Sequence, residues 1–432
     1  MKSLLHIRTV AFVMFASLCA DAAPKVSNVQ MSQAKMTSNV TVTYDLSDED
    51  AVVTFDILTN GVSIGAANVT HAVGDVNRVV KTGTGKKIIW SSYNSWPDRV
   101  IKDGSVQAVV TAWSLDCPPP VMAVDLLHKS NIVFYASVDQ LPGGVTNIAY
   151  KTDWLIMRKI PARGCTYTKG ATVAENSAGT GGTRPHMVAF TNDFYLGIYE
   201  MTQKQLFNVA GVRCSSNFTN RADSDCLPCD TVAWGRSASI GTLDSLRDWH
   251  NNIHESVHPQ GMVSLADDNS LSLNMHSLLY KLAHHAGIAF DLPTSAQWEY
   301  ACRAGSAARF NNGSMTDMDK LGWYVDNSED TPHPVGLKAE NAFGLYDMHG
   351  NVCEWVLDYA YTDAAHDKST DYDIEPAGHS PNGSYLKECR GGSYKSERYS
   401  CGAVSYTSMG VNYIPVHGDA VGFRLWAPGS LR

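Results

Sequence analysis

The sequence predicts an all-β domain followed by a larger α+β domain. The stretches VTVTYDL (40–46) and AVVTFDIL (51–58) alternate apolar and polar side chains, as strands with one buried face do. Further along, Thr202 and Thr294 are each followed three residues later by Gln, a pattern that starts helices, and strand-like segments lie between and after them. A chain of 432 residues is long enough for two or three domains.

Residues 1–23 are typical of a secretory signal peptide. Lys2 and Arg8 precede an apolar run, and small residues come before Pro24. The run is short for a membrane span, so we expect an exported chain (periplasmic, cell-surface or extracellular) whose mature form has no membrane span. The net charge of −9, without a Lys/Arg run, argues against nucleic acid as a partner.

Residues 24–115 are predicted to form a β-sandwich of the immunoglobulin or fibronectin type. Asn60-Gly61 indicates a two-residue hairpin, because both residues tolerate positive φ. KKIIW (86–90) and SVQAVVTAW (105–113) supply further strands, which makes six or seven short strands in all. Because no titratable cluster occurs there, we interpret this domain as a spacer or an interaction module.

Residues 116–150 begin with Cys117 and three consecutive prolines, which favour an extended chain. They form either a linker or extra strands, and the pattern does not decide between the two. The second predicted domain covers 151–432. Its helices are expected to start after Thr202 and end near Gly211, to cover about 273–286, and to start after Thr294 and end at Gly305.

Four blocks occur in order in the second domain. They are LPTSAQWEYACRAG (292–305), NAFGLYDMHGNVCEW (341–355), RGGSY (390–394) and GFRLW (422–426). Together they resemble the formylglycine-generating enzymes, or sulfatase-modifying factors, over about residues 154–428. The resemblance implies a formylglycine-generating-enzyme fold with a C-type-lectin-like core.

The resemblance also implies a calcium site in the second block. Asp347 and Glu354 would supply carboxylates, and Gly350 and Val352 would supply backbone carbonyls. Calcium takes six to eight oxygens, and a Gly-containing turn can direct successive carbonyls at one ion. The alternative is that Asp347 caps a turn and Glu354 forms a surface salt bridge.

The catalytic copper site of the family's oxidases is incomplete in this chain. Those enzymes hold copper between two cysteine thiolates five residues apart, shortly after the GGSY block. Aligned without a gap, these positions are Ser396 and Cys401; alternatively, Cys401 matches a third family cysteine that forms a disulfide with the cysteine equivalent to Cys302. Either way a thiolate is missing, so we do not expect copper. Ser393 matches a serine of the oxygen site, which leaves Cys401, Ser393 and Ser396 as the catalytic candidates.

Ten cysteines occur in the chain, and removal of Cys19 with the signal leaves an odd number in an oxidising compartment. Cys353 stands where the family's oxidases have a tryptophan, and the resemblance places it in a strand next to that of Cys389, which implies a disulfide. A further pair, Cys117 with Cys165, could join the linker to the second domain. The spacing of Cys214, Cys226 and Cys229 fits either a zinc site, with His250 or His254 as the fourth ligand, or a disulfide plus a spare thiol.

Three functions are compatible with these observations. The favoured one is a non-oxidase domain that binds a peptide, glycan or protein ligand through its polar C-terminal loops. The second is an active oxidase that converts a sulfatase cysteine to formylglycine, and the third is a retroelement-diversified surface receptor. The predicted ligand face includes Tyr406, Asn412, Tyr413 and His417.

Overall fold

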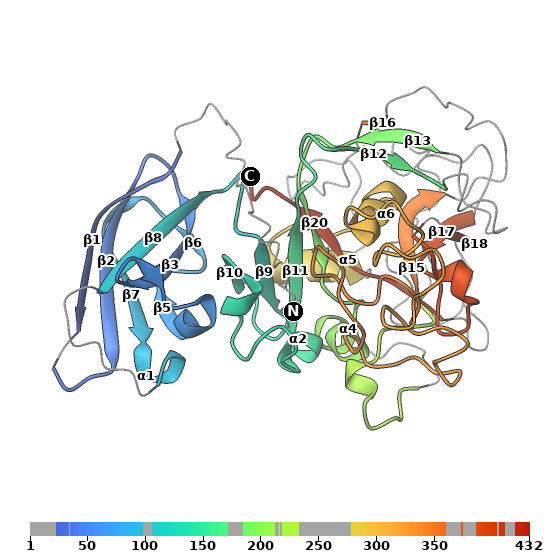
Figure 1. Ribbon diagram of the computed structural model, residues 1–432. Helices are drawn as coiled ribbons and strands as arrows, with labels where there is room; N and C mark the ends of the chain where they lie inside the picture. Colours follow the sequence, from blue (N-terminus) through green and yellow to red (C-terminus); the bar gives the residue numbers. More distant parts are fainter. Residues whose placement is uncertain are drawn as a thin grey trace, which may run out of the picture.

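The protein has two lobes in the computed structural model, an all-β lobe and a larger lobe with most of the helices (Figure 1). No helix among the described residues is long and apolar enough to cross a membrane. The structure describes residues 23–33, 35–97, 106–171, 185–211, 216, 218–232, 278–359, 373–374, 386–403, 406–410 and 420–432.

The all-β lobe is a sandwich of two sheets. Its core lies between them and includes Val42, Tyr44, Phe55 and Trp90, with the rings of Phe55 and Trp90 in an edge-to-face contact at 6.5 Å. The sheets have the orders β1-β2-β7-β5 and β4-β3-β6, with β8 paired to β3. The strands are β1 (Lys25–Gln33), β2 (Asn39–Ser47), β3 (Ala51–Thr59), β4 (Val62–Ser63), β5 (Ala72–Gly74), β6 (Val79–Val80), β7 (Gly83–Ser91) and β8 (Val106–Ser114), joined in part by η1 (Ala66–Val69) and α1 (Ser92–Ser95).

The predicted hairpin at Asn60-Gly61 is confirmed. Both residues have positive φ, 51° and 77°, and Thr59 pairs with Val62 across the turn. A two-residue loop with both central residues at positive φ follows the right-handed twist of the flanking strands, which is why this dipeptide is a strong signal.

The segment that could be a linker or extra strands forms strands. β9 (Val121–Asp125) and β10 (Ile132–Tyr135) belong to a five-stranded sheet of the larger lobe, with the order β10-β9-β11-β14-β20. All five residues of β9 are buried, because both faces of this sheet are covered. The other strands are β11 (Trp154–Ile160), β14 (Phe194–Gly197) and β20 (Trp426–Pro428).

The capping boxes at Thr202 and Thr294 are confirmed at the starts of α4 (Gln203–Ala210) and α6 (Ser295–Arg303). Gly211 closes α4 in the left-handed conformation, as predicted. The closing residue of α6 is Ala304 rather than Gly305, and it takes a φ of 46°. Between them lies α5 (Leu278–Ala286); its predicted start, at 273–277, lies outside the described residues.

The motif blocks meet around a second sheet of the larger lobe, which has the order β18-β17-β15-β19. Trp355, in strand β15 of this sheet, and Trp298, in α6, are fully buried. The remaining elements are β12 (Thr166–Lys169), β13 (His186–Ala189), β15 (Cys353–Tyr359), β16 (Asp373–Ile374), β17 (Leu386–Arg390), β18 (Tyr406–Gly410), β19 (Val421–Gly422), α2 (Ala149–Thr152), η2 (Val138–Gln140), η3 (Ser224–Cys226) and η5 (Arg398–Cys401).

The two lobes are in direct contact. Phe134 N donates to Asn77 O at 2.7 Å, which joins β10 to the sandwich. The C-terminal residue Arg432 lies at the boundary, where its guanidinium pairs with Glu49 and, at 3.2 Å, with Asp116 (Figure 1).

Candidate functional site

Two of the three catalytic candidates form one tight turn. Ser393 N donates to Ser396 Oγ at 2.9 Å, Ser396 N donates to Ser393 O at 2.9 Å, and the two hydroxyl oxygens are 3.2 Å apart. The Ser396 hydroxyl is therefore used within the turn.

The third candidate, Cys401, ends η5 and is buried in an apolar cluster that includes Phe310 and Met318. Its Sγ lies 3.7 Å from Glu397 O and 4.0 Å from Ser393 O. Burial raises the pKa of this thiol well above its usual range, because the apolar surroundings disfavour the thiolate. Without a bound metal, Cys401 is thus favoured in its neutral thiol form.

These residues do not fit a two-thiolate copper site. Cu(I) selects soft sulfur ligands, whereas Ser396 offers a hydroxyl at the first position. At the second position, Cys401 is a single sulfur atom in an apolar cluster. The absence of copper stays a prediction from the sequence.

The predicted Cys302–Cys401 disulfide is not present, since both residues are free thiols. His349 contacts both: its Nδ1 donates to Cys401 O at 2.7 Å, and its Nε2 lies 3.8 Å from Cys302 Sγ and accepts from Asn311 N. Burial lowers the pKa of His349 to about 4, so the ring is neutral and keeps this tautomer. The two cysteines do not form the predicted disulfide because the buried imidazole of His349 packs against both of them.

Cys353 and Cys389 lie in the neighbouring strands β15 and β17, as predicted, and both are free thiols. Trp355 pairs directly with Cys389, so Cys353 is the diagonal neighbour on the same face. Diagonal neighbours are usually about 7–8 Å apart, beyond the usual Cα separation in a disulfide. The two thiols nonetheless interact, and burial together with Cys353 raises the pKa of Cys389.

The remaining cysteines also do not form the predicted pairs. Cys117 and Cys165 are free, and Lys159 Nζ lies 3.4 Å from Cys117 Sγ. Cys229 Sγ lies 3.2 Å from Thr202 O. No three His, Cys, Asp or Glu side chains converge as a metal-ligand set in the described ranges. Cys214, His250 and His254 lie outside those ranges.

Glu354, a predicted calcium ligand, is buried in β15 and fully engaged by protein donors. Arg424 Nε donates to Oε1 and Oε2 at 3.0 and 2.9 Å, and Arg424 Nη2 donates to Oε1 at 2.7 Å. Trp298 Nε1 donates to Oε2 at 2.7 Å. Three N–H groups therefore engage both carboxylate oxygens, and one of them, Arg424 Nε–H, is shared between the two.

The other predicted carboxylate, Asp347, has a different environment. Its Oδ2 accepts from Gly336 N at 2.6 Å, whereas Oδ1 is buried without a hydrogen-bond partner in the described structure. Burial raises the pKa of Asp347 to about 6. Glu200 lies close by, accepts from Val352 N and Asn351 Nδ2, and has a pKa raised well above its usual range by burial and by Asp347.

Glu354 therefore does not fit as a calcium ligand, because Arg424 and Trp298 donate to both of its oxygens, whereas Asp347 keeps a buried oxygen without a hydrogen-bond partner in the described structure. Calcium at the block as a whole stays a prediction. The alternative, a surface salt bridge at Glu354, is wrong, because the ion pair with Arg424 is fully buried. Glu354 and Arg424 both occur in the sequence blocks, but they are far apart in the chain, so the sequence alone did not predict their ion pair.

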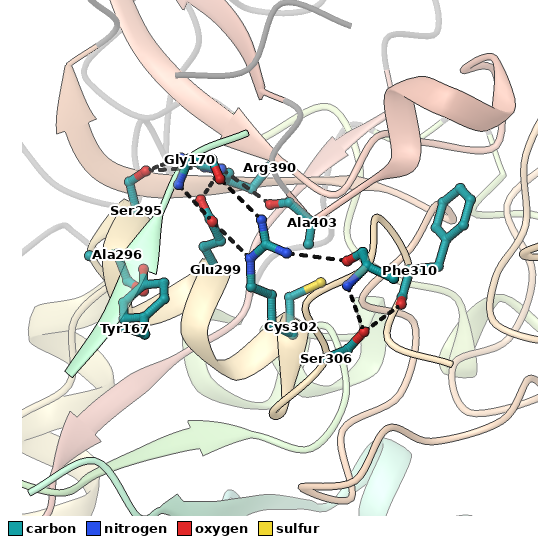
Figure 2. Close-up of polar contacts among 12 residues, drawn as sticks. Tyr167, Gly170, Ser295, Ala296, Glu299, Cys302, Ser306, Phe310, Arg390 and Ala403 are labelled. Carbon is teal, nitrogen blue, oxygen red and sulfur yellow. Dashed lines mark hydrogen bonds and ion pairs between the residues drawn. The ribbon is translucent and has the colours of Figure 1, made fainter. Parts of the chain in front are cut away.

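A second buried ion-pair network, which sequence reasoning missed, surrounds Glu299 of α6 (Figure 2). Glu299 Oε1 accepts from Gly170 N at 2.9 Å and from Arg303 Nε at 3.0 Å, and Oε2 accepts from Arg390 Nη1 at 3.2 Å. Arg390 also donates to Ser295 Oγ at the start of α6. The i,i+4 spacing of Glu299 and Arg303 was the available signal.

The predicted ligand face is described only at its first residue. Tyr406 begins β18, and its backbone pairs with Arg390 of β17. Asn412, Tyr413 and His417 lie outside the described residues.

The family model of the sulfatase-modifying factor enzyme 1-like domain matches the sequence of residues 158–427. This range includes all four blocks and both buried networks. The chain belongs to this family. The family assignment and the mixed fold around the second sheet confirm the predicted family and the predicted α+β fold class.

Relatives of this family member include a protein named chaperone protein LppX from Paenibacillus barcinonensis, 26% identical over 39% of this chain and 63% of that protein. A formylglycine-generating enzyme of Thermomonospora curvata is 30% identical over 31% of this chain and 48% of that enzyme. The chain thus spans less than two thirds of the length of these curated relatives. Among solved structures, PvdO from Pseudomonas aeruginosa is 20% identical, with a TM-score of 0.46, over 63% of this chain and 94% of that one.

Proposed function

We propose that this chain is an exported member of its family that lacks the oxidase activity and binds a peptide, glycan or protein ligand. The observation that carries the proposal is the pair Ser396 and Cys401. The first offers a hydroxyl engaged in its own turn, so that Cys401, in its apolar cluster, is the one sulfur at these two positions. Formylglycine generation, the activity named for several relatives, would need two thiolates there.

The sheet that carries the predicted ligand face supports a binding role. The segment between β18 and β19 begins and ends in one sheet, with β17 and β15 between its ends. Arg390 of β17 is fully buried and ion-paired to Glu299 at 3.2 Å, which holds this part of the sheet against α6. Loops positioned by a rigid scaffold are common binding elements.

The first lobe has the features of a module that presents the second. It is a sandwich with its own core, and it contacts the second lobe through Phe134 and through Arg432. In this proposal residues 1–23 direct export and are removed, so the sandwich begins the mature protein.

Copper titration of the reduced mature protein tests the loss of the oxidase site. Cu(I) is added in competition with a chromophoric chelator, with Cys401→Ser as the test variant and Cys117→Ser, which changes an exposed thiol, as the matched control. We expect no tight 1:1 binding by any of the three proteins. Tight 1:1 binding by the wild type that Cys401→Ser abolishes would overturn the proposal and justify an oxidase assay on a cysteine peptide.

Binding is tested by screening the mature protein against glycan and peptide arrays. The double variant Tyr413→Ala/His417→Ala alters the predicted ligand face, whereas Tyr93→Ala alters an exposed tyrosine on the sandwich. We expect the double variant to weaken the identified interaction at least about tenfold, which corresponds to about 1.4 kcal/mol of binding energy. Tyr93→Ala should leave the affinity unchanged. Equal binding by all three proteins would refute the assignment of this face.

A further inference from the structure

Arg424, in the GFRLW block between β19 and β20, is fully buried. Arginine stays charged in proteins and has five N–H donors in a fixed planar fork, so its burial requires an environment rich in acceptors. The surroundings of this one side chain meet that requirement.

Its guanidinium collects five oxygen atoms. Nη1 donates to Gly197 O at 2.9 Å and to Ile198 O at 3.2 Å, and Nη2 donates to Tyr346 O at 2.8 Å. The remaining two are the carboxylate oxygens of Glu354. One cation thus joins β14, the loop before Asp347, and β15, which are far apart in the sequence.

This acceptor set is similar in kind to a calcium shell, which combines carboxylate and backbone carbonyl oxygens. Both oxygens of Glu354 are engaged, by Arg424 and by Trp298. A divalent ion at Glu354 would have to displace the guanidinium and leave it buried without its carboxylate, which is strongly unfavourable.

We propose that Arg424 is the built-in cation of this fold, and that it replaces a divalent ion at Glu354. The guanidinium neutralises the buried carboxylate and ties three segments together, which is the structural task of a bound calcium. The larger lobe therefore folds and remains stable without calcium.

One carboxylate oxygen of the predicted calcium set has no protein donor in the described structure. Asp347 Oδ1 is buried without a hydrogen-bond partner in the described structure. The experiment must therefore separate ion binding at Asp347 from binding at Glu354, for which Asp347→Asn and Glu354→Gln are matched, nearly isosteric variants.

The decisive measurement uses the wild-type mature protein. Its melting temperature is recorded in millimolar calcium and in EDTA, and Tb³⁺ is added to detect an ion next to an indole. Trp298 donates directly to Glu354, so a lanthanide at that carboxylate would lie beside an indole donor. We expect the melting temperatures in calcium and in EDTA to be equal. We also expect no saturable Tb³⁺ luminescence that depends on Glu354, that is, none that is lost in Glu354→Gln. A saturable rise in melting temperature with calcium that either variant removes would overturn the proposal.

Variants give an independent arm. Glu354→Gln removes the carboxylate that accepts from the guanidinium, and Arg424→Lys removes the planar fork of donors. Each variant should lower the melting temperature by the same amount in calcium and in EDTA, because the lost interaction is between protein side chains and does not involve an ion. Arg398→Lys, at a partly exposed arginine, is the control and should change little. Destabilisation by Glu354→Gln in calcium alone would contradict the proposal. If either variant fails to fold, the wild-type comparison still decides.

Discussion

Replacing Glu299 by glutamine should destabilise the larger lobe substantially. The carboxylate is fully buried and accepts from Gly170 N, Arg303 and Arg390, which belong to the β12 end, to α6 and to β17 (Figure 2). Glutamine keeps the shape of the side chain but removes the negative charge between two arginines. Its NH₂ group must also face an N–H donor, because only one of its two terminal atoms is an acceptor.

The magnitude follows from the partners that remain. Removing one member of a buried ion pair typically costs about 3–5 kcal/mol. Arg390 retains Glu388 at 3.4 Å, so we expect the lower end, about 3 kcal/mol. At about 2–4 °C per kcal/mol for a domain of this size, the melting temperature should fall by roughly 6–12 °C.

Calorimetry of the full mature chain measures this shift. The matched control is Arg398→Gln, at a partly exposed arginine that donates to Tyr324 OH at 2.6 Å and to Thr316 O at 3.2 Å and lies 3.7 Å from Asp319 and from Asp326. Exposed pairs contribute about 0–1 kcal/mol, so this variant should lose much less. A Glu299→Gln shift no larger than that of the control would show that the network contributes little, and would refute the reasoning.

Three further predictions concern single positions. Burial raises the pKa of Asp230 from 3.8 to about 6, so the folded state binds this proton more tightly than the unfolded state and stability falls as pH rises from about 4 through 6. Asp230→Asn should therefore be stabilising at pH 8 by up to about 3 kcal/mol but not at pH 4, and an equal effect at both pH values in thermal melts would contradict this. Gly322→Ala should strongly lower the melting temperature, because an added Cβ would lie 1.3 Å from His349 O, whereas Gly313→Ala adds only backbone strain; similar losses would refute the steric argument. In native-state alkylation followed by mass spectrometry, exposed Cys117 should react and buried Cys401 should react only on unfolding; rapid labelling of Cys401 would show that its cluster opens.

Local signals in the sequence predicted local structure well. Capping boxes and the Asn-Gly turn act within four residues, so neighbouring side chains suffice to specify them. The strand pattern also located the sandwich. The segment 121–135 was ambiguous because a strand buried on both faces has no alternation, and only its position inside the five-stranded sheet shows why.

The candidate site was less predictable, because it depends on contacts between distant segments. Resemblance alone suggested a Cys302–Cys401 disulfide, whereas the packing of His349 against both residues is a tertiary fact. Likewise, the spacing of Asp347 and Glu354 suits calcium when their block is considered alone. The competing cation, Arg424, lies in another block.

By itself, the sequence determined the family and the fold class, since these depend on which residues are present and in what order. Tertiary structure alone decided which charges neutralise one another. A buried carboxylate requires a cation, and residue types cannot reveal whether an ion or a protein side chain supplies it. Here the chain brings Arg424 to Glu354, because β15 and β19 are neighbours in one sheet.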